Sequence, residues 1–180
     1  MHLAERHALL DQFRSSHHRL LALVSRLSHS QWHFRPAPGR WSIADCLEHV
    51  TAVEARVLAA IHKQLEGPAD PSKRALTEGK DAAVRQRIPD RSNRIEAPEP
   101  VRPTGRWPET AELLAQYQAT RNRTIQFVTD TVADLRSRSW PHIALGDLDC
   151  YQWLLAMSHH GDRHALQIQE IQQHPDYPAT

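Results

Sequence analysis

DCYQWLLAMSHHGDRHALQIQEIQ, residues 149–172, repeats apolar side chains at intervals of three and four positions. That spacing places them on one face of an α-helix, and no proline interrupts the segment. His160 and His164 stand on the same face, between Met157 and Ile168, where core residues are expected. Side chains four positions apart on a helix stack above one another. The segment therefore predicts an amphipathic helix that carries two neighbouring imidazoles into the protein interior.

Three more segments show the helical spacing. Residues 3–27 predict one helix, and a second begins at Pro108 or Thr110 and ends at Leu135. The helix between these two begins at Ser42, which is followed three positions later by Asp45, a pattern typical of a helix N-terminus. That helix ends at Gly67-Pro68, and residues 28–41, which contain the turn dipeptide Pro38-Gly39, form a connector.

Residues 67–107 are rich in proline and poor in apolar side chains. A connection this long without regular structure is uncommon in a compact domain. Its simpler interpretation is a surface crossover along a bundle, and its alternative is a flap over a site. The two short connections make their helices antiparallel, and the long one lets the middle helices run the same way. We therefore predict a single all-α domain over 1–180, a four-helix bundle in up-down-down-up order.

Composition excludes several classes of protein. The 180 residues carry 22 basic and 21 acidic side chains, a net charge of +1, which is unlike the basic footprint of nucleic-acid binders. No apolar run reaches membrane-spanning length, and the N-terminus lacks a signal-peptide pattern. Two cysteines exclude a disulfide scaffold. We expect a cytoplasmic protein that binds neither nucleic acid nor membrane.

A third histidine completes a candidate metal site. Among 13 histidines, His49 lies on the apolar face of its helix, between Cys46 and Val53. If the helices of His49 and His164 are antiparallel neighbours, both residues lie about 10–12 Å from the same end of the bundle. Three imidazoles at one level can share an ion and leave coordination positions open, as in catalytic zinc sites. The alternative is that they are hydrogen-bonded core residues.

Other side chains near this level have less specific roles. Gly161 stands where zincin proteases place their glutamate base, which argues against that class. Gln167 can orient the His164 imidazole. Arg121 interrupts the apolar face of the third helix, and we expect it to reach water rather than an anionic substrate. Glu48 and Glu54 are expected to face solvent or to pair between helices.

The remaining candidates have structural interpretations. Buried free cysteines behave as small apolar residues, and aromatic side chains usually pack. His159 should point away from its neighbour His160, and Arg163 should form a surface ion pair with Glu170, Asp45 or Glu48. The residues expected to pack in the core or at the end of the bundle are Cys46, Cys150, Trp41 and Trp153.

Two motifs resemble the DinB/YfiT-like superfamily. WSIADCLEH at 41–49, followed by Glu54, resembles the family's second-helix signature. HGDRHALQI at 160–168 resembles its fourth-helix pattern, and His142, Gly146 and Leu148 stand where the family places its last connector. The resemblance covers nearly the whole chain except 67–107.

The resemblance implies an up-down-down-up bundle, often a homodimer, with a divalent ion on His49, His160 and His164. Zinc or nickel is the expected ion, with manganese as an alternative. Relatives include transferases and isomerases that use low-molecular-weight thiols such as bacillithiol, mycothiol or glutathione. The first hypothesis is thus a metal-dependent enzyme that activates such a thiol, or water, for attack on a small electrophile. The second is a non-catalytic metal-binding or stress-associated dimeric helical module, and the third is a plain bundle with core histidines.

Overall fold

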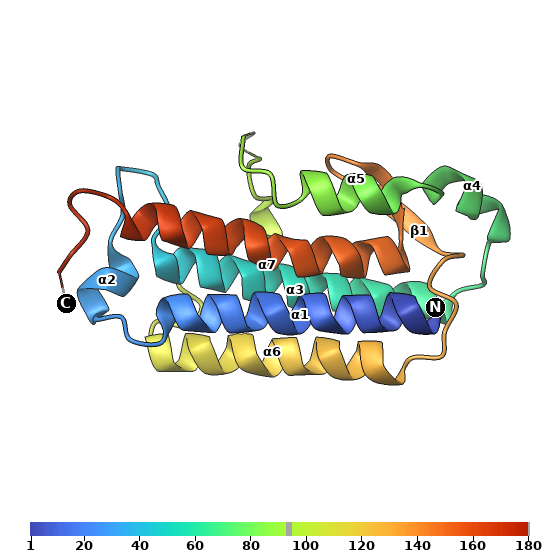
Figure 1. The fold of residues 1–180 in the computed structure, drawn as a ribbon, viewed down its shortest axis with the longest axis horizontal. Helices are drawn as coiled ribbons and strands as arrows, with labels where there is room; N and C mark the ends of the chain where they lie inside the picture. The colour runs from blue at the N-terminus through green and yellow to red at the C-terminus, as the bar shows by residue number, and fades with distance from the viewer. Residues whose placement is uncertain (93–94, 180) are drawn as a thin grey trace.

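Four long helices form the body of the protein (Figure 1). The computed structural model describes residues 1–92 and 95–179. The long helices are α1 (Leu3–Val24), α3 (Ile43–Glu66), α6 (Thr110–Asp130) and α7 (Cys150–Gln172). In Figure 1, α1 and α7 run in one direction and α3 and α6 in the other. The predicted four-helix bundle in up-down-down-up order is confirmed.

The packing places α7 against both α1 and α3, while α6 packs on α3 and α1. The helix that carries His49 and the helix that carries His160 and His164 are therefore antiparallel neighbours. This arrangement satisfies the condition under which the three histidines share one level of the bundle.

Capping side chains fix where α3 and α7 begin. Ser42 accepts the backbone N–H of Asp45, and the Asp45 carboxylate accepts the backbone N–H of Ser42. Asp149 and Gln152 make the same reciprocal pair at the start of α7. Each pair satisfies two N–H groups that lack partners within the helix. Both starts agree with the sequence-based prediction.

Three predicted segments differ from the structure. The first helix ends at Val24 rather than at residue 27, and the connector at 28–41 contains a short helix, α2 (His29–His33). The helix predicted to reach Leu135 ends at Asp130, because the chain turns extended at Thr131. Val132, which lies within the predicted helix, is 98% exposed, whereas Leu135 is buried and belongs to the loop that follows α6.

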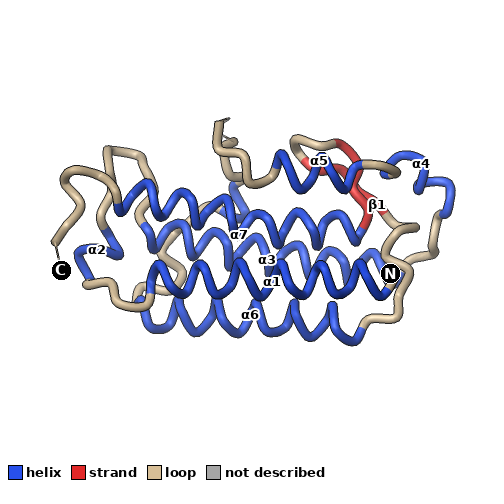
Figure 2. Tube along the Cα trace, viewed as in Figure 1, coloured by secondary structure: helices blue, strands red, loops and turns tan. Residues whose placement is uncertain are grey.

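The chain also forms a β-hairpin, which the all-α prediction missed (Figure 2). Its antiparallel strands are β1 (Ser139–His142) and β2 (Gly146–Asp149), and Gly146 adopts a positive φ at the turn. Strands of four residues are too short to show a clear alternation of polar and apolar residues. The indole of Trp140 stacks on that of Trp153 and joins the hairpin to α7.

The crossover is more regular than its composition predicts. It contains η1 (Pro71–Lys73), α4 (Arg74–Thr77), α5 (Lys80–Arg87) and η2 (Glu99–Val101). Figure 1 shows α5 lying along α7, and the fully buried Val84 provides its apolar contact with the core. One buried valine among charged residues is too weak a pattern to predict a helix of this length.

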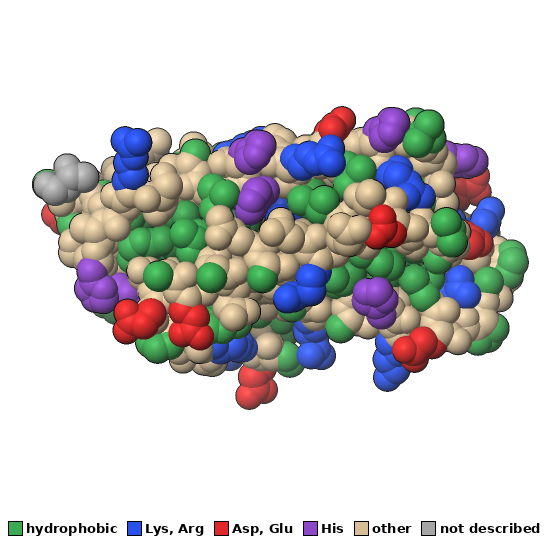
Figure 3. Space-filling model, turned by 90° about the horizontal axis from the view of Figure 1, so that it is seen from below, with side chains coloured by type: hydrophobic (Ala, Val, Ile, Leu, Met, Phe, Trp, Pro, Cys, Tyr) green, Lys and Arg blue, Asp and Glu red, His purple; other side chains and the backbone are tan. Residues whose placement is uncertain are grey.

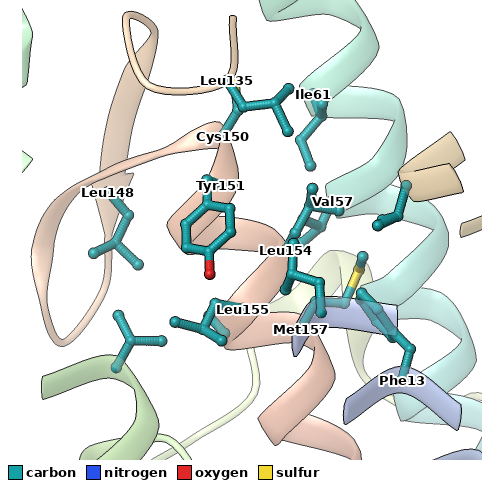
Figure 4. Packing of buried hydrophobic residues seen from close by; sticks show 14 of the residues in the cluster. Phe13, Val57, Ile61, Leu135, Leu148, Cys150, Tyr151, Leu154, Leu155 and Met157 are labelled. Atoms are coloured by element: carbon teal, nitrogen blue, oxygen red, sulfur yellow. The ribbon is translucent and has the colours of Figure 1, made fainter. Parts of the chain in front are cut away.

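The core consists of two apolar clusters. One occupies the end of the bundle nearest the N-terminus and includes Phe13, Ile61 and Leu154 (Figure 4). The other occupies the opposite end and includes Leu20, Leu47 and Ile168.

Between the two clusters lies a buried polar layer, to which each long helix contributes a side chain. These side chains, all at most 1% exposed, are Ser16, Glu54, Arg121 and Ser158. This layer provides the setting of the candidate site.

On the face in Figure 3, acidic and basic side chains are interspersed among apolar ones rather than gathered by sign. Within residues 1–92 and 95–179, no helix is long and apolar enough to cross a membrane.

Candidate metal centre

The three predicted histidines meet between α3 and α7. Ring centroids lie 5.0 Å apart for His49 and His160, 4.9 Å for His49 and His164, and 4.5 Å for His160 and His164. One nitrogen from each ring lies within 4.8 Å of the others. His49 and His164 are buried and His160 is half-buried. Two helices thus bring three imidazole nitrogens to one point.

Hydrogen bonds leave the correct nitrogens free for an ion. The Nδ1 of His49 lies 2.7 Å from the Val101 carbonyl, which can only accept, so this nitrogen carries the proton. The Nδ1 of His164 lies 3.0 Å from Gln167 Oε1, and it donates in the same way. In both rings Nε2 then keeps its lone pair. Such a partner on the far nitrogen is the usual device that orients metal-binding histidines.

The spacing of the nitrogens also fits an ion. Zinc–nitrogen bonds of about 2.0–2.1 Å in tetrahedral geometry place two ligand nitrogens roughly 3.3 Å apart. The Nε2 atoms of His160 and His164 are 3.1 Å apart. The cluster of His49, His160 and His164 can therefore hold a divalent ion.

Electrostatics keep these rings neutral. Burial lowers the pKa of His49 and outweighs its hydrogen bond to Val101. Burial, followed by the neighbouring imidazoles, lowers the pKa of His160 and His164 well below the usual range. Neutral imidazole is the form that binds metals, so at neutral pH no proton needs to leave.

Arg121 lies in the polar layer beside the cluster and is fully buried. Its Nε and Nη2 donate to the Glu54 carboxylate, at 2.9 and 2.8 Å, and Nη1 donates to the Phe13 carbonyl and Ser16 Oγ. The interhelical pairing expected for Glu54 is confirmed. The expectation that Arg121 reaches water is wrong, because acceptors on α1 and α3 satisfy it inside the bundle. A side chain so engaged is not available to bind substrate.

Gly161 allows this layer to close beside His160. A Cβ at this position would lie 3.3 Å from the Ser16 Cβ and 3.6 Å from Arg121 Nη2. The absence of a side chain therefore lets α7 approach α1 and the buried guanidinium closely.

The crossover is hydrogen-bonded to Glu48, the residue next to His49. Glu48 accepts hydrogen bonds from the backbone N–H groups of Thr104 and Gly105, at 2.8 and 2.9 Å, and from Arg106 Nη1 at 2.8 Å. Glu48 is 4% exposed, so the expectation that it faces solvent or pairs between helices is wrong. Its partners are mostly backbone groups of a distant segment, which no spacing rule identifies. The crossover thus spans the bundle and also covers part of the site.

Trp41 contacts two of the three imidazoles. Its ring centroid lies 4.8 Å from that of His49 and 6.0 Å from that of His164, the latter in a stacked arrangement. Trp41 packs against the apolar cluster at this end of the bundle, as expected, and it also forms a wall of the site. The short connection before Ser42 brings it there.

The other candidates are not ligands. His159 points toward Asp162, 3.5 Å away, on another side of α7. Arg163 donates to the Asp90 backbone carbonyl in the crossover. Burial raises the pKa of Cys46 well above its usual range and that of Cys150 to about 12, so both thiols stay protonated. They act as small apolar residues of the core, as predicted.

Comparisons with known proteins agree with this architecture. The sequence profile of the DinB superfamily matches residues 12–168, most of the chain. The uncharacterized protein YuaE of Bacillus subtilis (strain 168) is 23% identical over 147 residues, or 82% of this chain and 86% of YuaE. Among solved structures, YfiT from Bacillus subtilis has a TM-score of 0.62 at 15% identity, covering 99% of this chain and 91% of YfiT. YfiT is described as a probable metal-dependent hydrolase with an unusual four-helix bundle topology.

Proposed function

The chain belongs to the DinB superfamily, and we propose that it is a divalent-metal-dependent enzyme with His49, His160 and His164 as ligands. One observation carries the proposal: three neutral imidazoles converge, and the two with fixed tautomers turn Nε2 inward. A divalent ion would supply Lewis acidity, which acidifies a water or thiol nucleophile and polarises an electrophile. Three protein ligands leave room for the reactants.

The described residues around the histidines do not provide a free carboxylate that could deprotonate a nucleophile. The two nearby carboxylates of α3 are both engaged, Glu48 by the crossover and Glu54 by Arg121. Neither is free to remove a proton from a reactant. Activation therefore depends on the ion, which suits a nucleophile that reacts once it has lost a proton.

We propose transfer of a low-molecular-weight thiol to a small electrophile as the first reaction to test. The family resemblance supports it, and a thiol needs no side-chain base. Hydrolysis is the second candidate, because the fold matches that of YfiT, itself described as a probable hydrolase. In either case Trp41 shields the imidazoles, and the Val101 carbonyl and Gln167 keep them oriented.

Metal content of the purified, untagged protein is the first test. After loading with zinc, nickel or manganese and removal of excess ion, plasma mass spectrometry should find about one ion per chain. His49→Ala and His160→Ala should abolish binding, whereas His7→Ala, an exposed histidine of α1, should not. A wild-type protein that takes up none of the three metals would refute the proposal.

Assays of the loaded protein then separate the reactions. Bacillithiol, mycothiol and glutathione are each supplied with a small chloro-aromatic electrophile, and activated esters and amides are supplied without thiol. Turnover that disappears in His160→Ala identifies the reaction class. Stoichiometric metal without turnover would favour the metal-binding module instead. The homodimer, which we also propose from the resemblance, is tested by light scattering.

A further inference from the structure

We propose that Arg91, a crossover residue, is a positioning residue that dictates which nitrogen of His164 is free to bind the ion. The inference rests on the proposed metal centre and concerns how this chain holds one of its ligands ready. Two hydrogen bonds connect the crossover to His164 through the side chain of Gln167.

The Gln167 side chain links the two residues through one atom. Its Oε1 accepts a hydrogen bond from Arg91 Nη1 at 3.2 Å, and it lies 3.0 Å from His164 Nδ1. On its far side Arg91 is held by Glu170, from Nε to Oε1 at 2.7 Å and from Nη2 to Oε2 at 2.5 Å. The fork of the guanidinium is thus anchored to α7, and its remaining arm is aimed at the Gln167 oxygen.

Without Arg91, the direction of the Gln167 amide would be undetermined. An amide presents an oxygen at one end and an NH2 group at the other, and rotation by 180° exchanges them. With the NH2 group toward His164, Nδ1 would have to accept and the proton would move to Nε2. A protonated Nε2 has no lone pair for an ion. The orientation of this amide therefore decides whether His164 is ready to bind.

Arg91 removes the choice because a guanidinium has only donors. An NH2 group turned toward Arg91 would face another donor in a site where Arg91 is only 19% exposed. The oxygen must therefore face Arg91. The same oxygen then faces His164, which makes Nδ1 the donor and Nε2 the free nitrogen.

The crossover consequently sets the tautomer of two ligands by different means. It acts on His49 directly, through the Val101 carbonyl, and on His164 through Arg91 and Gln167. Arg91 and Val101 lie ten positions apart along the chain, one before and one after residues 93–94, which the structure does not describe. The segment that resembles no family motif thus orients two of the ligands that the motifs supply.

A rescue experiment tests this role. Arg91→Ala and Arg91→Met, which keeps more packing, are each made in the wild-type and in a Gln167→Glu background. A carboxylate has two acceptor oxygens and no donor, so it fixes the His164 tautomer without help from Arg91. Long-range 1H–15N NMR of the metal-free proteins at pH 8 reports the protonated nitrogen of His164, and a competing chelator measures zinc affinity.

We expect the wild-type to show His164 protonated at Nδ1 alone. Both Arg91 variants should show a mixture of tautomers and bind zinc about 10–100-fold more weakly, the usual effect of losing such a partner. In the Gln167→Glu background the same variants should keep the Nδ1 proton and lose less than about 3-fold in affinity. Thermal unfolding verifies that each variant is folded.

Two outcomes would overturn the proposal. An unchanged tautomer in both Arg91 variants would show that Gln167 orients itself. Equal losses of affinity in both backgrounds would show that Arg91 only anchors the crossover. The tautomer measurement needs no metal, so failure of the proposed metal centre would appear as absent zinc binding and would be distinguished from failure of the Arg91 role.

Discussion

Replacing Glu54 by alanine should destabilise the protein by about 3–5 kcal/mol, because it leaves the Arg121 charge buried without its counter-ion. Arg121 is fully buried and Glu54 is 1% exposed, so water cannot replace the lost carboxylate. The hydrogen bonds from Nε and Nη2, at 2.9 and 2.8 Å, both disappear. Each charge-assisted bond of this kind contributes about 1.5–3 kcal/mol. The Phe13 carbonyl and Ser16 Oγ still accept hydrogen bonds from Arg121. We therefore expect the loss of stability to lie in the lower part of the range that two such bonds give.

Glu54→Gln retains one acceptor oxygen and nearly the same shape, so it should cost about 2–3 kcal/mol. Removing the partner as well, in Glu54→Gln/Arg121→Met, should recover most of that loss, because an apolar side chain leaves no buried charge. Urea unfolding of the metal-free proteins, followed by circular dichroism, measures all four free energies of unfolding.

A loss below about 1 kcal/mol for Glu54→Ala would refute the reasoning, since it would mean that the Arg121 charge does not depend on the pair. A double variant no more stable than Glu54→Gln alone would refute it in another way. It would show that the cost arises from packing around the polar layer rather than from an unpaired charge.

Three further outcomes follow from other contacts. Burial, and then Arg121, lowers the pKa of His17 from 6.5 to about 4, so the folded state binds fewer protons; stability should be full above pH 6.5 and fall toward pH 4. Between pH 6.5 and pH 4, thermal melts should show that His17→Gln loses about 1–2 kcal/mol less stability than the wild-type protein. Glu48→Ala should speed amide exchange at Thr104 and Gly105 at least 10-fold by hydrogen-exchange mass spectrometry, because it removes their acceptor. Cobalt should quench tryptophan fluorescence, and Trp41→Phe should remove most of that change; quenching unaffected by Trp41→Phe would place the ion elsewhere.

The sequence predicted best where local and global signals agree. The helix start at Ser42 was identified from its capping residues and the start at Asp149 from the spacing of apolar side chains, and the structure has a capping pair at both. The level shared by His49 and His164 followed from helix rise and antiparallel packing, both of which are fixed by the backbone. Each of these inferences needs only residues close together in the sequence, or the regular geometry of a helix.

Contacts between distant segments could not be predicted. Arg121 was expected to reach water, because nothing near it in the sequence shows that Glu54 stands opposite on another helix. The Val101 carbonyl is a backbone group, so its hydrogen bond to His49 leaves no side-chain pattern. The hairpin was missed because its strands are four residues long and its stabilising contact, Trp140 on Trp153, spans two elements.

The polar layer explains how a bundle can hold such a site in its interior. Buried polar groups reduce stability unless each finds a partner. Here Glu54 and Ser16 accept hydrogen bonds from Arg121, and Ser158 donates to the Leu155 carbonyl. An apolar cluster lies on each side of the polar layer. The free energy gained by burying these apolar side chains offsets the cost of burying the polar ones. The histidines then need no charged partner of their own, because they are neutral and the outer nitrogens of His49 and His164 are already hydrogen-bonded. The three candidate ligands are thus neutral groups, and the positive charge of the buried Arg121 beside them is paired with Glu54.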